Sequence, residues 1–409
     1  MSRANFMDRL LDGVDVEWKA LGEITSVLRG KRLTKSQLIE GEKFRVYHGG
    51  LEPLGCYAES NRPANSVMII NVGASAGTVG YSPVEFWSSD GCFCLEHSAL
   101  INNRFLYYVM IGHQSLMRSR VRVAGIPTLD AVVIDKLEIP VPCPENTKKS
   151  LEIQAEIVRI LDVFTELTAE LTTELTTELA ARKKQYDYYR DQLLSFEQGE
   201  VTWKPLGEIG EFIRGRRFTK ADYVKDGISA IHYGEIYTRY GVFTTKVFSQ
   251  VRKDMAESLR YAEHGDVVMA GVGETIEDVG KAVAWLGNEK VAIHDDSYAF
   301  RHSMNPKFLS YVMQTSAFID EKAKHVSRGK VNRLLIDGVA KVRIPIPYPE
   351  SFDRSLVEQA RIVAILDTFD ALTNSITESL PREIALRQKQ YEYYRDLLLS
   401  FPKPEEVAA

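Results

Sequence analysis

Leucine recurs at every fourth position in one stretch near the middle of the chain, where "TELTAELTTELTTEL" spans residues 165–179. Four residues advance about 400° around a helix that turns once per 3.6 residues, so successive leucines shift by only about 40°. The leucines of this drifting apolar stripe are Leu167, Leu171, Leu175 and Leu179. Threonine is β-branched and loses rotamer freedom in a helix. The pattern therefore predicts a long helix, from about residue 152 to 196, whose leucine stripe packs against a partner.

The remaining parts of the chain show shorter periods. Runs such as "SVMIINVG" and "DVVMAGVG" are apolar and broken by glycine, which is typical of buried strands. The segments "FLYYVM" and "FLSYVM" fit short helices instead. Outside the long helices, the pattern predicts a fold of the α+β class in which strands and short helices are mixed.

The sequence is an internal duplication. "WKALGEITSVLRGKRLTK" at 18–35 reappears as "WKPLGEIGEFIRGRRFTK" at 203–220, with eleven of eighteen positions identical. "RKKQYDYYRDQLLSF" at 182–196 returns as "RQKQYEYYRDLLLSF" at 387–401. Insertions separate the matching motifs of the globular parts, whereas the helical segments keep equal length. A helix that leaves the first unit and an equal one that returns from the second predict an antiparallel pair with approximate two-fold symmetry.

Composition narrows the class of protein. No run approaches the ~20 apolar residues of a membrane span, and the N-terminal residues lack the continuous apolar core of a secretory signal. The four cysteines lie in the first part of the chain, which fits reduced thiols better than a disulfide framework. Cys92 and Cys94 have no second pair at a zinc-finger spacing, so we expect core strand residues. We therefore expect a soluble, cytoplasmic protein. The net charge of −5 excludes a uniformly basic nucleic-acid binder, so DNA contacts must be local or shared with partner subunits.

The ordered motifs resemble those of a known family. Both globular units end in a proline motif, "IPVPCPE" or "IPIPYPE", and each is followed by "EIQAEIVRILD" or "VEQARIVAILD" and a tyrosine-rich helix. Over almost its whole length the chain thus resembles the specificity subunit of type I restriction-modification enzymes. The T-x-E-L array resembles the subgroup in which such repeats set the gap between the two halves of a split DNA site.

The resemblance implies a division of labour along the chain. Target recognition domains at 1–145 and 199–350 would each read one half-site of double-stranded DNA. A central helical spacer at 146–198 and a C-terminal helical spacer at 351–409, forming a coiled coil, would set the gap. The helices would dock two methyltransferase subunits, which restriction and translocase subunits join. The complex would then direct adenine methylation or restriction at a split, asymmetric site.

Three groups of side chains are candidates for DNA contact. The first places basic residues around a glycine in both copies, which suits phosphates and guanine edges; its members are Arg29, Lys31, Arg32 and Lys35, with Arg214, Arg216, Arg217 and Lys220. The second comprises Arg118, Arg120 and Arg122, with Lys324, Arg328, Lys330 and Arg333. The third consists of polar side chains at loop tips, of which Tyr233 is the candidate for DNA contact; the group comprises Tyr47, His48, His232, Tyr233 and Glu235, with Ser75, Thr78 and Thr275 on the glycine loops. The alternatives are a solvated turn or contact with a partner subunit for the first group, a basic helix end for the second and aromatic packing for the third.

A tyrosine cluster on each helical arm is the candidate for partner docking. Tyr186, Tyr189, Tyr391 and Tyr394 belong to it. So many aromatic rings on one helix are expected to be buried, either against the opposite arm or against a partner subunit. Since the two arms are similar, one chain would offer equivalent seats to two copies of one partner.

Catalysis is not expected of this chain. The Asn- or Asp-Pro-Pro-aromatic tetrad of the adenine methyltransferases is absent from the sequence, and "VGASAGTVG" lacks the Gly-Lys-Ser/Thr ending of a phosphate loop. We therefore expect no catalytic residue, metal or cofactor. A coiled-coil adaptor that does not bind DNA is the alternative function, and a self-sufficient methyltransferase is a third. Sequence-selective, salt-dependent DNA binding distinguishes the first hypothesis from the adaptor.

Overall fold

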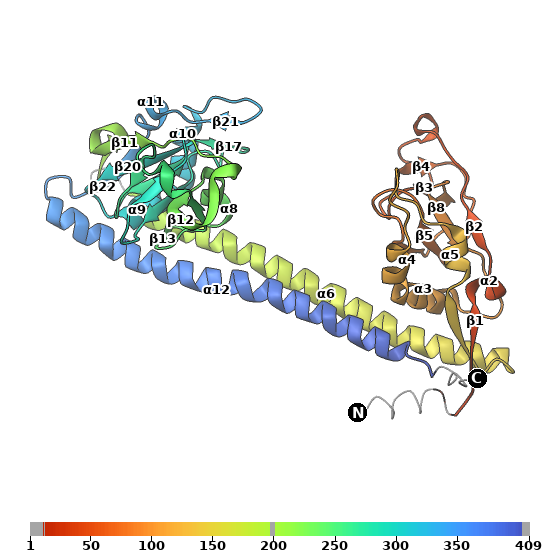
Figure 1. Ribbon diagram of the computed structural model, residues 1–409. Helices are drawn as coiled ribbons and strands as arrows, with labels where there is room; N and C mark the ends of the chain where they lie inside the picture. The colour runs from red at the N-terminus through yellow and green to blue at the C-terminus, as the bar shows by residue number, and fades with distance from the viewer. Residues whose placement is uncertain (1–10, 12, 197–200, 403–409) are drawn as a thin grey trace. The chain divides into compact units, whose positions relative to one another are not determined.

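The computed structural model describes residues 11, 13–196 and 201–402. The chain divides into two compact units, one formed by residues 1–175 with 381–409 and the other by residues 176–380. Each unit holds one globular domain together with parts of two long helices, α6 (Thr147–Leu193) and α12 (Phe352–Leu398), of 47 residues each. Figure 1 shows both domains and both helices. The predicted α+β fold with duplicated mixed domains and long helices is confirmed.

The first domain combines a four-stranded sheet, a three-stranded sheet and a two-stranded pair with short helices. Its strands are β1 (Val16–Ala20), β2 (Val27–Arg29), β3 (Phe44–Tyr47), β4 (Gly55–Tyr57), β5 (Ser66–Ile70), β6 (Val79–Ser82), β7 (Trp87–Ser88), β8 (Cys92–Leu95) and β9 (Glu138–Pro142). Its helices are α2 (Leu21–Ile24), α3 (Asn103–Gly112), α4 (Gln114–Ser119) and α5 (Ala131–Asp135), with a 3-10 turn η1 (Lys35–Gln37). One sheet has the order β2-β8-β5-β6 and is antiparallel; the other has the order β4-β3-β7. The proline motif forms β9, which pairs with β1.

The second domain repeats this arrangement with insertions. Its strands are β10 (Val201–Pro205), β11 (Gly210–Arg214), β12 (Tyr223–Ile231), β13 (Phe243–Thr244), β14 (Ser249–Val251), β15 (Tyr261–Ala262), β16 (Val267–Ala270), β17 (Val272–Gly273), β18 (Ala282–Trp285), β19 (Val291–Ile293), β20 (Ser297–His302), β21 (Asn332–Arg333) and β22 (Arg343–Pro347). Its helices are α7 (Leu206–Ile209), α8 (Tyr233–Thr238), α9 (Pro306–Val312), α10 (Ser316–Ala323) and α11 (Ile336–Val339), with 3-10 turns η2 (Lys220–Asp222) and η3 (Lys253–Met255). The order β11-β20-β16-β18 matches β2-β8-β5-β6, and β13 extends that sheet. The second sheet, β14-β12-β19-β15, likewise has one strand more than its counterpart.

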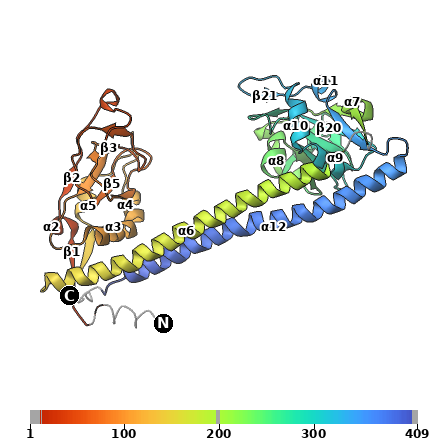
Figure 2. The same ribbon diagram turned by 180° about the vertical axis from the view of Figure 1, so that it is seen from behind.

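The start of one long helix packs against the end of the other in each unit. In the first unit, the ring of Phe164 on α6 stacks on Tyr394 of α12 at 5.6 Å, and Figure 2 shows these two segments side by side from behind. In the second unit, Tyr189 of α6 stacks on Phe369 of α12 at 5.8 Å. The helices are therefore antiparallel, and the contacts of one unit repeat in the other with the roles of the helices exchanged.

Local chemistry explains how the threonine-rich segment of α6 remains helical. The hydroxyls of Thr168, Thr172 and Thr173 each donate to the carbonyl oxygen four residues earlier, at 2.7, 2.7 and 2.9 Å. Such back-bonding satisfies the hydroxyl within the helix. Arg182 pairs with Glu178 at 2.7 Å, the order along the chain that favours a helix. The helix α12 continues through Pro381.

Each domain core is continuous with the long helices. Phe105 on α3 packs in one cluster with Ile157 and Leu161 of α6, and its ring lies 6.0 Å from that of Phe401. In the second domain Phe308 on α9 joins the cluster that contains Leu366 of α12. Burial of these side chains stabilises the attachment by roughly 1.5–3 kcal/mol for each large one. A domain and its helical supports therefore form one packed body.

Hydrogen bonds fix the same attachment in both units. The N–H of Asn102 donates to Gln154 Oε1 at 2.7 Å, and the N–H of Asn305 donates to Gln359 Oε1 at 2.9 Å. Both glutamines are buried. A buried amide without its partner would cost about 1–3 kcal/mol, so these bonds set the position of each domain on its helix.

Candidate nucleic-acid interface

The basic loop of the first domain follows β2 and lies against the turn between β7 and β8. A Cβ atom on Gly30 would meet the carbonyl oxygen of Ser89 at 2.0 Å, so only glycine fits there. The N–H of Lys31 donates to the carbonyl of Ser88 at 2.9 Å, and Trp87 Nε1 donates to the carbonyl of Lys31 at 2.7 Å. Backbone contacts thus fix the loop, and its basic side chains extend from a rigid base.

The equivalent loop of the second domain is held in the same way. A Cβ atom on Gly215 would meet the carbonyl oxygen of His294 at 2.0 Å. The N–H of Arg216 donates to the carbonyl of Ile293 at 3.0 Å. The repeated motif Arg-Gly-x-Arg therefore encodes a close backbone approach, which explains the glycine in both copies.

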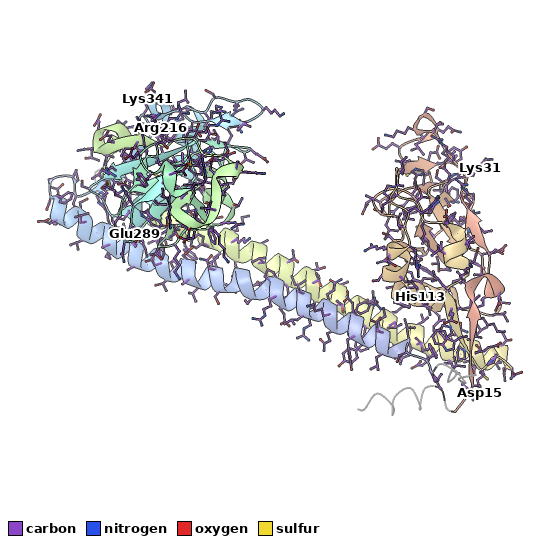
Figure 3. All side chains as sticks on the ribbon, viewed as in Figure 1. Asp15, Lys31, His113, Arg216, Glu289 and Lys341 are labelled. Atoms are coloured by element: carbon purple, nitrogen blue, oxygen red, sulfur yellow. The ribbon has the colours of Figure 1, made fainter. Side chains whose placement is uncertain are left out.

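Most side chains of this first basic group carry no counter-charge. Within the described part of the chain, seven of them are exposed and form no ion pair: Arg29, Lys31, Arg32, Lys35, Arg216, Arg217 and Lys220. Figure 3 labels Lys31 and Arg216, one from each loop. The eighth, Arg214, donates from Nε to the carbonyl of Asp295 at 2.9 Å. Cations without a protein partner are the groups that gain most from a phosphate.

The second basic group is divided between paired and unpaired side chains. In the first domain, Arg118 donates to the Thr78 hydroxyl at 3.1 Å and Arg122 pairs with Asp130 at 3.1 Å, whereas Arg120 is exposed. In the second domain, two side chains have acidic partners: Lys324 pairs with Glu321, and Arg333 pairs with Asp296 at 3.4 Å. Arg328 and Lys330 are exposed and lack an ion pair among the residues that the structure describes.

The two basic groups meet within each domain. In the second domain, Arg214 and Arg333 both reach the turn of Asp295 and Asp296. In the first domain, the basic loop shares a cavity with Thr128, whose backbone pairs with Arg122. Segments that are about 90 or more residues apart in sequence therefore form one basic end of each domain.

A cavity of about 590 Å³ lies at the basic end of the first domain. Its lining includes Arg29, Arg32, Leu33, Lys35, His48, Leu54, Asn71, Val72, Asp90 and Thr128. His48 Nδ1 lies 3.3 Å from Asp90 Oδ1 and accepts from the N–H of Gly91 at 3.2 Å. The cavity thus combines cations at three positions, one acidic group and apolar walls.

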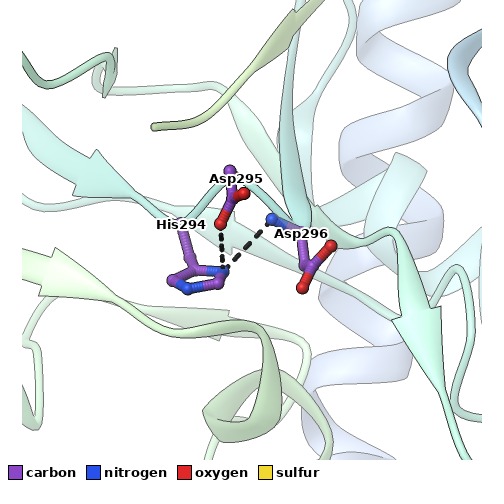
Figure 4. A group of neighbouring side chains, drawn as sticks. All are labelled: His294, Asp295 and Asp296. Atoms are coloured by element: carbon purple, nitrogen blue, oxygen red, sulfur yellow. Dashed lines mark hydrogen bonds and ion pairs between the residues drawn. The ribbon is translucent and has the colours of Figure 1, made fainter. Parts of the chain in front are cut away.

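The turn of the second domain contains the cluster shown in Figure 4. His294, Asp295 and Asp296 bring three potential ligand atoms within 4.8 Å of one another. However, His294 Nδ1 already accepts from the N–H of Asp296 at 3.1 Å, and Nε2 lies 3.1 Å from the carbonyl of Phe218. Both ring nitrogens are engaged, so this arrangement fits a braced turn rather than a metal site.

Two of the polar side chains at the loop tips have structural roles: one packs against an aromatic ring and the other caps a helix. Tyr233 lies against His232, with ring centroids 4.2 Å apart, and begins α8. His232 caps that helix by accepting from the N–H of Gly234 at 3.1 Å. Burial, and then the neighbouring His294, lower the pKa of His232 to about 4, so this imidazole is neutral at pH 7.

The tyrosines proposed for partner docking contact the opposite long helix. Tyr189 and Tyr394 stack on phenylalanines, as described above, and Tyr391 lies 3.1 Å from the Thr165 hydroxyl. Burial and nearby Asp370 raise the pKa of Tyr186. Tyr189 and Tyr394 are 42% and 37% exposed as residues, so part of each remains accessible for a further contact. Leu167 and Leu171 of the leucine stripe line a groove beside Tyr391, whereas Leu175 and Leu179 are half-buried.

Two residues of the interface were not predicted from the sequence. Asn71 and Asp90 contribute to the cavity but stand outside the basic motifs. Two sequence features could have identified them: Asn71 directly follows a strand-like apolar run, and Asp90 directly precedes a glycine. Cys92 and Cys94, in contrast, lie buried in β8 as predicted, and all four cysteines are free. Among the described residues, no helix is both long enough and apolar enough to cross a membrane.

Comparisons with known proteins give a consistent result. The family model described as the type I restriction modification DNA specificity domain matches residues 13–181 and again 199–386. The chain is 36% identical to the specificity subunit of the type I restriction enzyme EcoR124I/EcoR124II of Escherichia coli, over 100% of both proteins. It is 30% identical to a putative type I restriction enzyme specificity subunit of Haemophilus influenzae, over 97% of this chain and 98% of the relative. One similar solved chain comes from a structure of complex assembly in a type I restriction-modification system. The two chains have a TM-score of 0.67 at 17% identity, and the match covers 94% of this chain and 97% of that one. This similarity shows a shared fold.

Proposed function

This chain belongs to the type I restriction-modification DNA specificity family, and we propose that it is the non-catalytic subunit that reads the DNA sequence for such a complex. The observation that carries the proposal is the equivalent basic loop in both domains, at 29–35 and 214–220, with side chains that lack counter-charges. Two similar domains in one chain fit two separate half-sites. A coiled-coil adaptor that does not bind DNA would not explain these unpaired cations.

The loops support a specific division of contacts. Their exposed cations suit phosphates, which set register and affinity but carry no sequence information. The turns beside these loops differ at one aligned position: Gly91 directly before β8 corresponds to Asp296 directly before β20, whereas Asp90 corresponds to Asp295. Side chains at these turns would therefore distinguish the bases of one half-site from those of the other.

The experiment that tests DNA reading is a binding measurement with the chain in complex with its modification subunits. DNA that carries the modified site of the system and a scrambled control are titrated at several salt concentrations. The proposal expects tighter binding of the specific site and an affinity for both DNAs that falls with salt. Equal affinity for site and scrambled DNA would support the adaptor instead.

The helices extend the proposal to spacing and assembly. We place the recognition domains at 1–145 and 199–350 and the spacers at 146–198 and 351–409, with the T-x-E-L segment setting the gap of a split, asymmetric site. Two methyltransferase subunits would dock at the tyrosine clusters of the two units, because these clusters repeat with the same contacts. Restriction subunits would then join this core. Four free cysteines fit action in the cytoplasm, where chromosomal DNA lies.

A further inference from the structure

The cavity of the first domain contains a buried hydrogen-bond acceptor without a donor. Asn71 is only 5% exposed, and its Oδ1 atom has no hydrogen-bond partner among the described residues. Its backbone is fixed, since its N–H donates to Gly91 and its carbonyl accepts from Leu129. An unpartnered buried carbonyl costs about 1–3 kcal/mol, which a ligand with an N–H donor would recover.

The remaining lining restricts the chemistry of that ligand. Leu33, Leu54 and Val72 provide apolar walls, and the unpaired cations Arg29, Arg32 and Lys35 stand around the same space. A ligand that satisfies all three features has a flat apolar body, an N–H donor and a negative charge. The cavity volume of about 590 Å³ lies within the range of small-molecule sites, roughly 300–1,000 Å³.

The second domain fills the equivalent place with its own side chains. Gly271 stands where the first domain has Asn71, and a Cβ atom on Gly271 would come within 2.9 Å of the Tyr298 ring. Arg333 pairs with β17 as Thr128 pairs with Val72, and it forms an ion pair with Asp296. An aromatic ring and an ion pair thus replace the open, acceptor-lined space of the first domain.

We propose that the cavity of the first domain binds one nucleotide whose base donates an N–H group. This N–H donates to Asn71 Oδ1, the base lies between the apolar walls, and the phosphate pairs with the cations of the basic loop. This inference rests on the proposed DNA-reading function. The nucleotide is either extruded from the bound duplex or a free mononucleotide, since both present the same chemistry.

Two variants and one control isolate the cavity. Asn71→Ala removes the acceptor, and Thr128→Arg places at the mouth the side chain that the second domain has at Arg333. Because Asn71 is buried, its variant must first match the wild-type thermal unfolding midpoint, and the half-exposed Thr128 provides the independent variant. Thr202→Arg, the same substitution at an exposed position of β10 in the second domain, is the matched control.

In the first arm, the complete complex binds duplexes that carry 2-aminopurine or pyrrolocytosine at each position of both half-sites in turn. An extruded nucleotide predicts a several-fold fluorescence rise at one position other than the methylated adenines, lost in Asn71→Ala and Thr128→Arg but kept in Thr202→Arg. In the second arm, AMP, CMP, GMP and TMP are dialysed against the complex without DNA. A free-nucleotide site predicts saturable binding of at least one of them, lost in Asn71→Ala and Thr128→Arg but kept in Thr202→Arg.

The outcomes separate the two levels of the proposal. A variant-dependent signal in either arm supports the nucleotide site and identifies its source. If neither arm shows one while the complex still selects its DNA site, the nucleotide inference is overturned and DNA reading stands. If the complex binds no DNA selectively, the proposed function fails, and the mononucleotide arm alone decides whether the cavity binds a nucleotide.

Discussion

The Tyr311 hydroxyl donates a hydrogen bond to the Asp367 carboxylate across 2.9 Å and thereby joins helix α9 of the second domain to α12. Lys307 Nζ reaches the other oxygen of the same carboxylate at 2.7 Å. In the first unit, Tyr108 and Arg104 likewise contact one carboxylate, but both donate to the same oxygen, Asp162 Oδ1. A domain that reads DNA must be rigid on the element that sets its position, and this triad with its counterpart supplies that rigidity.

Asp367→Ala removes the shared acceptor and leaves the tyrosine hydroxyl and the lysine without a partner. We expect the second unit to lose about 1–3 kcal/mol of stability, because an unsatisfied buried polar group costs that much. Thermal unfolding measures the loss. Glu392→Ala, an exposed position on the same helix, is the control and should change stability by no more than about 0.5 kcal/mol. Equal effects of the two variants would contradict the role of the triad.

Gly30→Ala should displace the basic loop of the first domain. The added Cβ atom would stand 2.0 Å from a backbone carbonyl, which cannot move aside as a flexible side chain can. We expect weaker DNA binding and a lower unfolding temperature. At Gly112 an added Cβ atom meets nothing within 4 Å, so Gly112→Ala should be neutral or slightly stabilising. Unchanged DNA affinity of Gly30→Ala would show that the loop position does not matter for binding.

Lys31→Gln should weaken binding to specific and scrambled DNA alike. If the side chain contacts one phosphate, the slope of log affinity against log salt should fall by about 1. Arg216→Gln tests the equivalent position of the second domain. Arg159→Gln, whose exposed side chain on α6 pairs with Glu156, is the control and should leave the slope unchanged. A slope that stays the same in both loop variants would exclude phosphate contacts by these side chains.

Stability should depend on pH through His302. Burial lowers the pKa of this side chain to about 4, from an ordinary value of 6.5. Between these values the unfolded chain takes up a proton that the folded chain does not, so stability should fall as the pH drops from about 6.5 towards 4. His302→Asn, which keeps an acceptor for the N–H of Met304, should reduce this slope while His232 still contributes. Above pH 7, variant and wild type should differ by a constant amount; parallel curves over the whole range would contradict the assignment.

Deletion of residues 172–175 should shorten the gap between the half-sites. One T-x-E-L unit adds about 6 Å of helix and rotates it by about 40°, so its loss leaves the leucine stripe nearly in phase. At ~3.4 Å per base pair, the gap should shrink by between one and two base pairs, with both half-sites unchanged. Insertion of a further unit should lengthen it by the same amount. An unchanged gap in both variants would refute the spacing role.

The sequence was informative wherever the two copies could be compared. The duplication predicted paired helices and matching domains, and the repeated Arg-Gly-x-Arg motif marked a loop whose glycine proves indispensable on steric grounds. The leucine stripe predicted a helix that α6 confirms. These features depend on local periodicity and on near neighbours in sequence, which a single sequence does contain.

Other features depend on contacts between distant segments. Asn71 and Thr128 line one cavity because separate loops converge there, and no spacing in the sequence reveals that. Proline lacks a backbone N–H and usually interrupts a helix, yet α12 continues through Pro381. The threonines of α6 bond back to the helix, a compensation that propensity alone does not include.

The most direct test of DNA reading by two domains is a map of the adenines methylated in cells that express this chain with its modification subunits in a host without other adenine methylation. Single-molecule sequencing would provide the map. The account predicts one motif of two short, different half-sites separated by a fixed number of unspecified bases, and no methylation when the chain is omitted. A single continuous motif, or methylation that persists without the chain, would contradict it.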